Sequence, residues 1–229
     1  MIQIPETFAR GTADREGESG NVAEPDAFEA WDGRGAVRLY DRDDARFAML
    51  LERVHASTLA EIADDDEIAQ IAGRINRRLA IPAPPGLPRL SDRVDAWEES
   101  LRRDSRELAD AVPHAAVDAA LATLRELGRD QPDVVVHGDL HARNILRAAR
   151  EPWLVVDPKG YVGDPAYDGA TVLRVRAREL LWEDGPSKAV VRMLEIFAES
   201  AELEFDRVRR WARFRAVESV FWGRLRGVE

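Results

Sequence analysis

The sequence predicts an α+β protein with a mainly helical C-terminal part. Two observations lead to this prediction. Short apolar runs bounded by turn residues occur within residues 36–54 and again within 134–157, as expected for strands. Longer stretches between and after these runs show the three- and four-residue apolar spacing of amphipathic helices. A small β-rich start, a helical middle, a short β segment with polar residues and a helical end together favour the α+β class.

The first third of the chain holds an arm, a short helix and two strands. Residues 1–23 are polar, contain glycine and lack apolar periodicity, which is typical of a flexible arm. Residues 25–32 are expected to end a helix that Gly33 closes. The runs 36–40 and 46–54 are expected to form two strands joined by the acidic turn "DRDD".

The middle of the chain is expected to be helical. Residues 56–80 have a helical pattern, and the proline-rich stretch "IPAPPGLP" (81–88) interrupts it as a linker or ordered loop. Residues 91–111 and 114–128 then predict two further helices. Pro113 stands near the start of the second, where proline is tolerated.

The last part predicts three short strands followed by helices. The strands are expected in "DVVVHG", "NILR" and "PWLVVD", and the helices at about 165–182, 187–201 and 205–226. In the last helix four apolar side chains recur at spacings of three and four residues and predict one buried face: Phe214, Val217, Phe221 and Leu225.

Composition narrows the class of protein. The 229 residues include 33% charged residues and carry a net charge of −10, which argues against a general nucleic-acid binder and suits a cationic ligand. The absence of cysteine excludes disulfides, zinc-thiolate sites and cysteine nucleophiles. No apolar run approaches the roughly 18–20 residues that span a bilayer, and no signal-peptide pattern opens the sequence. We therefore expect a cytoplasmic protein with no membrane or nucleic-acid partner.

The stretch "VVVHGDLHARNIL" (134–146) carries the clearest chemical motif. Asp139 and Asn144 stand five residues apart after an apolar strand, and Asp157 ends the next apolar strand. This pattern suits phosphoryl transfer to a hydroxyl group: Asp139 would accept the hydroxyl proton, while Asn144 and Asp157 would hold Mg²⁺ on nucleotide phosphates. The same order of residues occurs in the kinase catalytic loop and its metal-binding acid.

Two other interpretations of this motif remain open. A lone H-x-D pattern is common and usually structural. His137, Asp139 and His141 would alternatively form a zinc or manganese site of a hydrolase, since two histidines and an acid are a familiar ligand set.

The segment "VVVHGDLHARNILRAAREPWLVVDPKGYVGDPAYD" (134–168) resembles the aminoglycoside/hydroxyurea antibiotic resistance kinases, the family that includes streptomycin 6-kinase. "HGDLHARN" resembles the family's catalytic loop, and "VVDPKG" stands where protein kinases have D-F-G. The resemblance extends over about residues 24–225. It implies a protein-kinase-like fold of the aminoglycoside phosphotransferase type, with ATP and Mg²⁺ as cofactors.

The resemblance also implies roles for individual residues. Asp139 would be the catalytic base, and Asn144 and Asp157 the Mg²⁺ ligands. His137 and Asp168 would support the catalytic loop. The nucleotide-binding residues would be those of the hinge and the apolar floor under adenine: Glu52, Arg53, Val54 and Leu146. Lys159 is assigned equally to a phosphate or substrate contact and to an exposed loop.

The chain departs from the family before the hinge. Its only lysines are Lys159 and Lys188, so no strand lysine precedes the catalytic loop. Glu24 resembles the glutamate that pairs with that lysine in kinases. "GRGAVR" (33–38) has two glycines of a phosphate loop but Arg38 at the third position, and we interpret it as a turn.

These observations predict a flexible arm at 1–23, a remnant N-terminal lobe and hinge at 24–54, and a helical C-terminal lobe with the catalytic loop at 55–229. The first functional hypothesis is an ATP-dependent O-phosphotransferase that inactivates an aminoglycoside-type or other small-molecule antibiotic, of the streptomycin or hydroxyurea class. Its small-molecule acceptor would be cationic. The second hypothesis is a catalytically impaired remnant that serves as a binding module or does little, and it predicts an exposed apolar face where strands are missing. The acceptor and the oligomeric state have no readable signal in the sequence.

Overall fold

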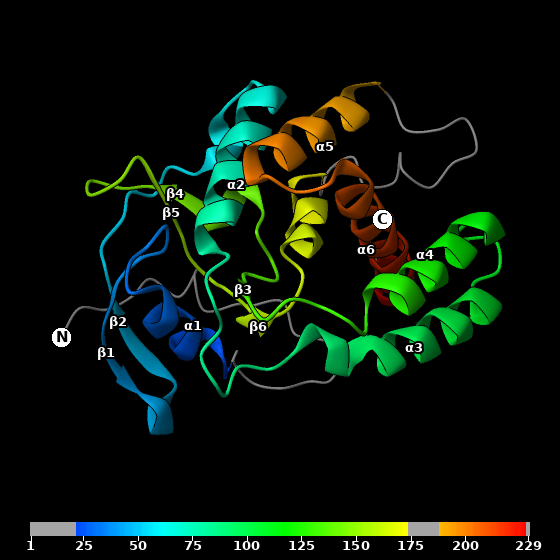
Figure 1. The fold of residues 1–229 in the computed structure, drawn as a ribbon, viewed down its shortest axis with the longest axis horizontal. Coiled ribbons are helices and arrows are strands. Elements are labelled where there is room, and N and C mark those ends of the chain that lie inside the picture. Colours follow the sequence, from blue (N-terminus) through cyan, green and yellow to red (C-terminus); the bar gives the residue numbers. More distant parts are fainter. Residues whose placement is uncertain (1–21, 174–187, 228–229) are drawn as a thin grey trace.

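The computed structural model describes residues 22–173 and 188–227 (Figure 1). The predicted arm at 1–23 therefore falls almost wholly outside the described residues, as does the second half of the helix predicted at 165–182. A β hairpin lies at one end of the molecule and helices α3, α4 and α6 lie at the other, with the short central strands between them.

The N-terminal part consists of helix α1 (Glu24–Trp31) and the antiparallel strands β1 (Leu39–Asp43) and β2 (Ala48–Leu51). α1 has proline in its first turn and ends where Asp32 adopts a left-handed conformation. β1 begins three residues later than predicted and contains part of the acidic stretch assigned to the turn. The turn is instead the 3₁₀ segment Asp44–Arg46, because the side chain of Asp43 accepts a hydrogen bond from the backbone N–H of Arg46.

The predicted helix 56–80 is shorter than expected. Its first turn is a separate 3₁₀ segment, Leu59–Glu61, and helix α2 spans Asp65–Leu79. α2 begins there because the carboxylate of Asp64 caps it by accepting the backbone N–H groups of Asp66 and Glu67. The two helices predicted next are present. They are α3 (Val94–Glu107), preceded by the 3₁₀ segment Leu90–Arg93, and α4 (His114–Leu127).

Two short antiparallel pairs form the centre. Strand β3 (Val135–Val136) pairs with β6 (Tyr161–Val162), and β4 (Ile145–Arg147) pairs with β5 (Trp153–Val155). The hairpin of β4 and β5 has the predicted position, whereas β6 was not predicted. The 3₁₀ turn η5 (Ala142–Asn144) leads into β4.

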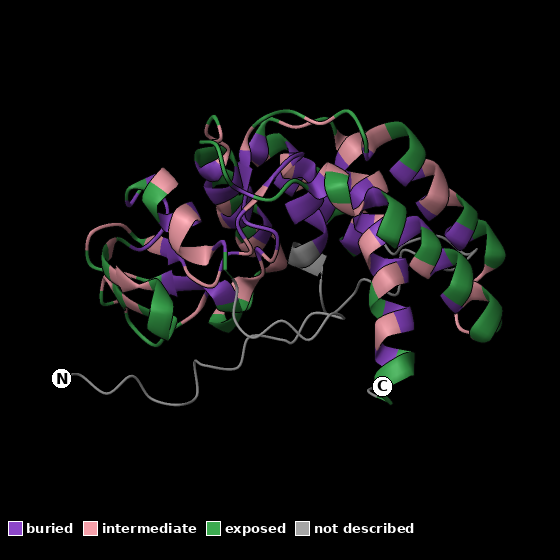
Figure 2. Ribbon diagram, turned by 90° about the horizontal axis from the view of Figure 1, so that it is seen from below, coloured by how far each residue is buried: buried purple, intermediate pink, exposed green. Residues whose placement is uncertain are grey.

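The chain closes with the 3₁₀ segment η6 (Pro165–Leu173) and helices α5 (Lys188–Ala201) and α6 (Phe205–Arg226). α5 packs against α2, and α6 packs against α4 and η6. Three of the four side chains predicted for the buried face of α6 are buried, but Leu225 is 48% exposed. That part of the prediction is wrong because the last turn of α6 projects beyond the elements on which the helix packs (Figure 2).

The core runs through the centre of the molecule and beneath α6, where buried residues concentrate in Figure 2. Its aromatic part joins three helical elements: the rings of Trp97 and Tyr167 stack with centroids 5.8 Å apart, and Trp211 meets Tyr167 edge-on at 5.5 Å. Within the two described ranges, no helix is both long and apolar enough to cross a membrane.

Candidate active site

The residues of the predicted catalytic loop lie between two strand pairs. The loop leaves β3, passes through η5 and enters β4, while the segment after β5 returns through Asp157 to β6. The backbone N–H of Val156 donates to the carbonyl of Asn144 at 2.9 Å. Asn144 and Asp157 therefore emerge from the same end of the β4–β5 hairpin, as the prediction for the metal site requires.

His137 holds the loop through both ring nitrogens. Its Nδ1 accepts the backbone N–H of Asp139 at 3.2 Å, so Nε2 carries the proton and donates to the carbonyl of Val156 at 3.0 Å. The ring is fully buried, and burial lowers the pKa of His137 to about 4. The neutral imidazole has no nitrogen left for a metal. This argues against the hydrolase site of His137, Asp139 and His141, and the described residues contain no group of three histidine or acidic side chains suited to a metal.

Asp168 fixes the start of the loop. Its two carboxylate oxygens accept the backbone N–H groups of His137 at 3.0 Å and Gly138 at 2.8 Å. Burial raises the pKa of Asp168 to about 7, against the lowering effect of these two hydrogen bonds. Gly138 has φ of 84°, and a Cβ there would lie 2.7 Å from the ring of Tyr161, so this turn requires glycine.

Asp164 positions η6 and with it Asp168, a role that sequence reasoning missed. One oxygen of Asp164 accepts the backbone N–H of Ala166 at 3.0 Å. The other accepts the indole N–H of Trp211 at 2.5 Å and Nε of Arg207 at 2.6 Å. The carboxylate thus joins η6 to α6. Its signal in the sequence was the first acid of "GDPAYD", but its partners lie more than 40 residues away.

Asp139, the predicted base, is held by its backbone and leaves its carboxylate partly open. Its carbonyl accepts Nδ2 of Asn144 at 3.1 Å, and its side chain is 19% exposed. Nε2 of His141 lies 3.6 Å from Oδ2 of this carboxylate. This arrangement leaves the carboxylate able to accept a proton from a bound hydroxyl group.

Arg215 of α6 is a second residue near the loop that the sequence did not indicate. Its guanidinium lies 5.0 Å from the centroid of the Tyr167 ring and forms an ion pair with Glu218. Burial lowers the pKa of Arg215, but Tyr167, Glu218 and Asp139 raise it above its ordinary value. The positive charge of Arg215 therefore acts on Asp139 of the loop from α6.

The oxygens of Asn144 and Asp157 fit a hard cation. The amide nitrogen of Asn144 is bonded to Asp139, which leaves the amide oxygen as a ligand. Burial and the charge of Asp139 raise the pKa of Asp157, and Lys159 opposes them from 3.6 Å. A divalent cation would relieve the repulsion between these acids. Mg²⁺ commonly takes one or two protein oxygens and completes its shell with phosphates and water.

The predicted hinge runs beside β4. The backbone N–H of His55 donates to the carbonyl of Arg147 at 2.8 Å, and the neighbouring Leu146 is only 3% exposed. The carboxylate of Glu52 accepts Nε of Arg150 at 3.0 Å, and Arg150 lowers the pKa of Glu52. Arg53 is exposed and Val54 is half-buried. Glu52 thus uses its side chain to tie the hinge to the β4–β5 turn. Its backbone N–H donates to the carbonyl of Arg38 at 2.8 Å, which leaves its backbone carbonyl for a nucleotide.

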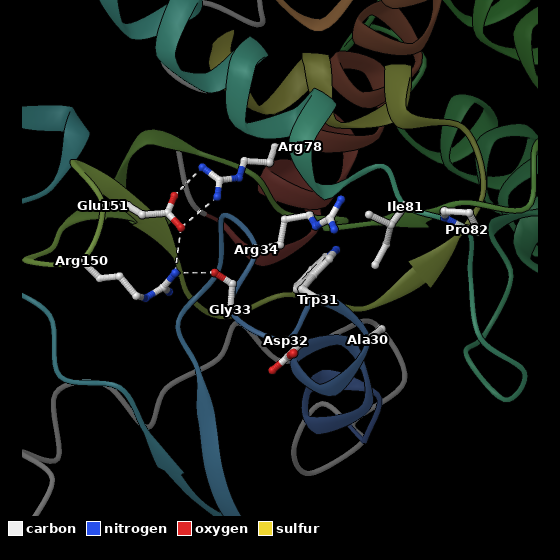
Figure 3. Close-up of a pocket in the computed structure, with 10 residues that line it drawn as sticks. All are labelled: Ala30, Trp31, Asp32, Gly33, Arg34, Arg78, Ile81, Pro82, Arg150 and Glu151. Carbon is white, nitrogen blue, oxygen red and sulfur yellow. Dashed lines mark hydrogen bonds and ion pairs between the residues drawn. The ribbon is translucent and has the colours of Figure 1, made fainter.

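A separate hollow of about 720 Å³ lies at the C-terminal end of α1 (Figure 3). Its walls come from the end of α1, the end of α2 and the β4–β5 turn. Arg78 and Arg150 both donate hydrogen bonds to the carboxylate of Glu151. Glu151 thereby neutralises part of the positive charge of the wall of this hollow. None of the predicted site residues lines this hollow, so it is not the predicted active site.

Comparison with known sequences gives close relatives. Streptomycin 6-kinase of Streptomyces griseus is 37% identical over 195 residues, which cover 84% of this chain and 64% of the relative. Hydroxyurea phosphotransferase of Kitasatospora aureofaciens is 32% identical over 208 residues, 88% of this chain and 58% of the relative. The chain therefore spans about three fifths of the length of these curated relatives.

Solved structures share the fold. An aminoglycoside phosphotransferase from Streptomyces rimosus, in complex with ADP and streptomycin, matches 86% of this chain and 83% of its own chain with a TM-score of 0.53 and 19% identity. An aminoglycoside-3'-phosphotransferase of type VIII matches with a TM-score of 0.54, also at 19% identity, over 87% of this chain and 79% of its own. The predicted protein-kinase-like fold of the aminoglycoside phosphotransferase type is thereby confirmed.

The family model described as aminoglycoside/hydroxyurea antibiotic resistance kinase matches residues 8–227, nearly the whole chain. The chain belongs to the aminoglycoside/hydroxyurea antibiotic resistance kinase family.

Proposed function

We propose that this chain is a small-molecule O-phosphotransferase that moves the γ-phosphoryl group of ATP to a hydroxyl group of an antibiotic of the aminoglycoside or hydroxyurea class. The observation that carries the proposal is the bonded catalytic loop, in which His137, Asp168 and Asn144 fix the backbone around the open carboxylate of Asp139. Family membership supports the same reaction type. The names of the relatives, with streptomycin and hydroxyurea among them, support the acceptor class.

Asp139 would orient the acceptor hydroxyl and take its proton. The acceptor oxygen then forms a bond to the γ-phosphorus while the bond to the β–γ bridging oxygen breaks, which leaves ADP and the phosphorylated acceptor. Neutral His137 does not compete for the proton, since burial keeps its pKa near 4. The loop contributes position and charge, which is most of what this reaction requires.

Asn144 and Asp157 would hold Mg²⁺, which would neutralise charge on the nucleotide phosphates. The backbone of Glu52, Arg53 and Val54 would meet adenine, with Leu146 beneath the base. The net charge of −10 favours a cationic acceptor. These assignments of residues to nucleotide and metal are part of the proposal.

The test is ADP release from Mg-ATP by the purified chain, with streptomycin, hydroxyurea and a panel of aminoglycosides as acceptors. We expect release that depends on one of these acceptors and is lost in Asp139→Asn. Asp118→Asn is a matched control, because Asp118 is an exposed acid on α4. ADP release at the same rate with and without each acceptor, or release that persists in Asp139→Asn, would contradict the proposal.

One observation favours the alternative, a kinase-like module without turnover. The β1–β2 hairpin carries three large apolar side chains that are more than half exposed: Tyr40 at 60%, Phe47 at 70% and Leu50 at 54%. A two-stranded sheet is marginally stable by itself, and such exposure marks a face that further elements would cover. Calorimetric titration with ADP, with and without Mg²⁺, separates the two functions: a module that has lost the nucleotide site takes up no ADP.

A further inference from the structure

The segment between β5 and β6 holds Lys159, the only lysine among the first 187 residues. Its side chain is 12% exposed, and its Nζ lies 3.6 Å from Oδ1 of Asp157. Its backbone N–H donates to the carbonyl of His137 at 2.6 Å. The lysine is therefore held at the edge of the predicted metal site, not on an open loop.

The same segment packs against the start of α1. Gly160 has φ of 66°, and a Cβ there would lie 2.8 Å from the carbonyl oxygen of Ala23 and 3.0 Å from the side chain of Ala27. Glu24 follows Ala23 directly and opens the helix. The close approach of the two backbones thus brings a helix glutamate to the loop that carries Lys159 and Asp157.

The charges of these three residues act on one another. Burial and the charge of Asp157 raise the pKa of Glu24 to about 7, and the charge of Lys159 opposes this rise. Lys159 likewise opposes the rise in the pKa of Asp157. The ammonium group of Lys159 therefore lies beside the carboxylate of Asp157, and Glu24 of α1 lies within range of its charge.

In protein kinases a lysine held by a helix glutamate positions the nucleotide phosphates. We propose that Lys159, held beside Asp157 on a segment that packs against the start of α1, binds the nucleotide phosphates in this chain in place of a lysine on an N-terminal strand. The inference rests on the proposed function. A compact ammonium suits this position, because it offers three donors and a point charge to phosphate oxygens.

The experiment is calorimetric titration of the full chain with Mg-ADP and, separately, with adenosine. Lys159→Met should weaken Mg-ADP binding by about tenfold to a hundredfold, the loss expected for one charge-assisted hydrogen bond, and leave adenosine binding unchanged. Lys159→Arg should restore part of the Mg-ADP affinity. Lys188→Met is the matched control, since it removes an exposed lysine at the start of α5 and should bind like the wild type.

Glu24→Gln is an independent variant that leaves the lysine in place. It should weaken Mg-ADP binding severalfold with adenosine unchanged, because Lys159 loses a nearby acid whose charge acts on its ammonium group. This variant also tests phosphate binding by Lys159 if Lys159→Met fails to fold. Wild-type affinity for Mg-ADP in both Lys159→Met and Glu24→Gln would overturn the inference while leaving the proposed function intact. Binding of neither ADP nor adenosine by the folded wild type would overturn the proposed function and this inference together.

Discussion

The catalytic-loop region (134–168) and the N-terminal region (24–54) belong to the same fold but are built differently. In the first, buried side chains form hydrogen bonds with the backbone of the loop. Asp168, for example, accepts two N–H groups of the loop. In the second, a two-stranded hairpin exposes Tyr40, Phe47 and Leu50, and this end of the molecule is largely exposed in Figure 2. The proposed base, Asp139, thus lies in the densely hydrogen-bonded region, whereas the proposed hinge residues Glu52, Arg53 and Val54 lie in the more exposed one.

The N-terminal region is nevertheless anchored to the loop. The indole N–H of Trp31 donates to the carbonyl of Leu79 at 2.8 Å, and its ring stacks on His137 with centroids 6.2 Å apart. Glu52 and Arg150 tie the hinge to the β4–β5 turn. These contacts fix the N-terminal region and the hinge against the catalytic-loop region.

The largest expected effect comes from removing the base in the rigid region. Asp139→Asn should lower kcat by about 10²–10⁴-fold, because the variant accepts no proton, and should leave ADP affinity near that of the wild type. Steady-state kinetics and calorimetry measure the two quantities. A variant that keeps full kcat would show that the loop does not supply the base.

The next effect tests how firmly the loop is held. Asp168→Ala leaves the buried N–H groups of His137 and Gly138 without their acceptor, and we expect the free energy of unfolding to fall by about 2–4 kcal/mol. Urea denaturation measures it. Asp118→Ala, which removes an exposed acid from α4, is the control and should change stability by less than about 0.5 kcal/mol. Equal stability of the two variants would contradict the account.

A third prediction uses pH. The pKa of His137 is near 4 in the folded chain and 6.5 in the unfolded chain, so the unfolded chain takes up a proton first as pH falls. The stability due to neutral His137 is complete above pH 6.5 and is lost as pH falls toward about 4, by at most about 1.4 kcal/mol per pH unit.

His137→Gln should lack this part of the pH dependence of unfolding. His114→Gln, at the exposed start of α4, should retain it. The free energy of unfolding is measured by urea denaturation from pH 4 to 7. The difference between each variant and the wild type separates the contribution of His137 from that of the buried acids. The same slope in His137→Gln and the wild type would show that the ring is not held neutral.

The smallest expected effect lies in the N-terminal hairpin. Leu50 is 54% exposed, so Leu50→Glu should change the free energy of unfolding by less than about 0.5 kcal/mol. Ile145→Ala, at a fully buried position in β4, should lower it by about 2–5 kcal/mol. Thermal unfolding compares them. A loss in Leu50→Glu as large as that in Ile145→Ala would mean that the hairpin face is packed, and would remove the contrast between the two regions.

The sequence predicted the catalytic-loop region well because its signals are local. An apolar strand, polar residues at fixed spacing and a second apolar strand were enough to place Asn144 and Asp157 at one end of a hairpin. The start of α2 was predicted too early because Leu59 and Ile62 continue the apolar pattern, whereas the cap at Asp64 decides where the helix begins.

The residues that the sequence missed depend on tertiary contacts. Asp164 acts through Trp211, and Arg215 reaches Tyr167 and the loop from α6, with no motif at either position. Strand β6 has two residues and forms only because β3 lies beside it. The predicted nucleotide and metal ligands have a suitable placement, and their roles stay predictions.

The central claim is that the chain transfers a phosphoryl group despite its small N-terminal region. The most direct measurement is mass spectrometry of streptomycin, hydroxyurea and other aminoglycosides after incubation with the chain and Mg-ATP, beside Asp139→Asn. The account predicts that one acceptor gains the mass of a single phosphoryl group, in step with ADP formed, and that the variant gives none. Unchanged acceptors across the panel, from folded protein that binds Mg-ADP, would contradict it.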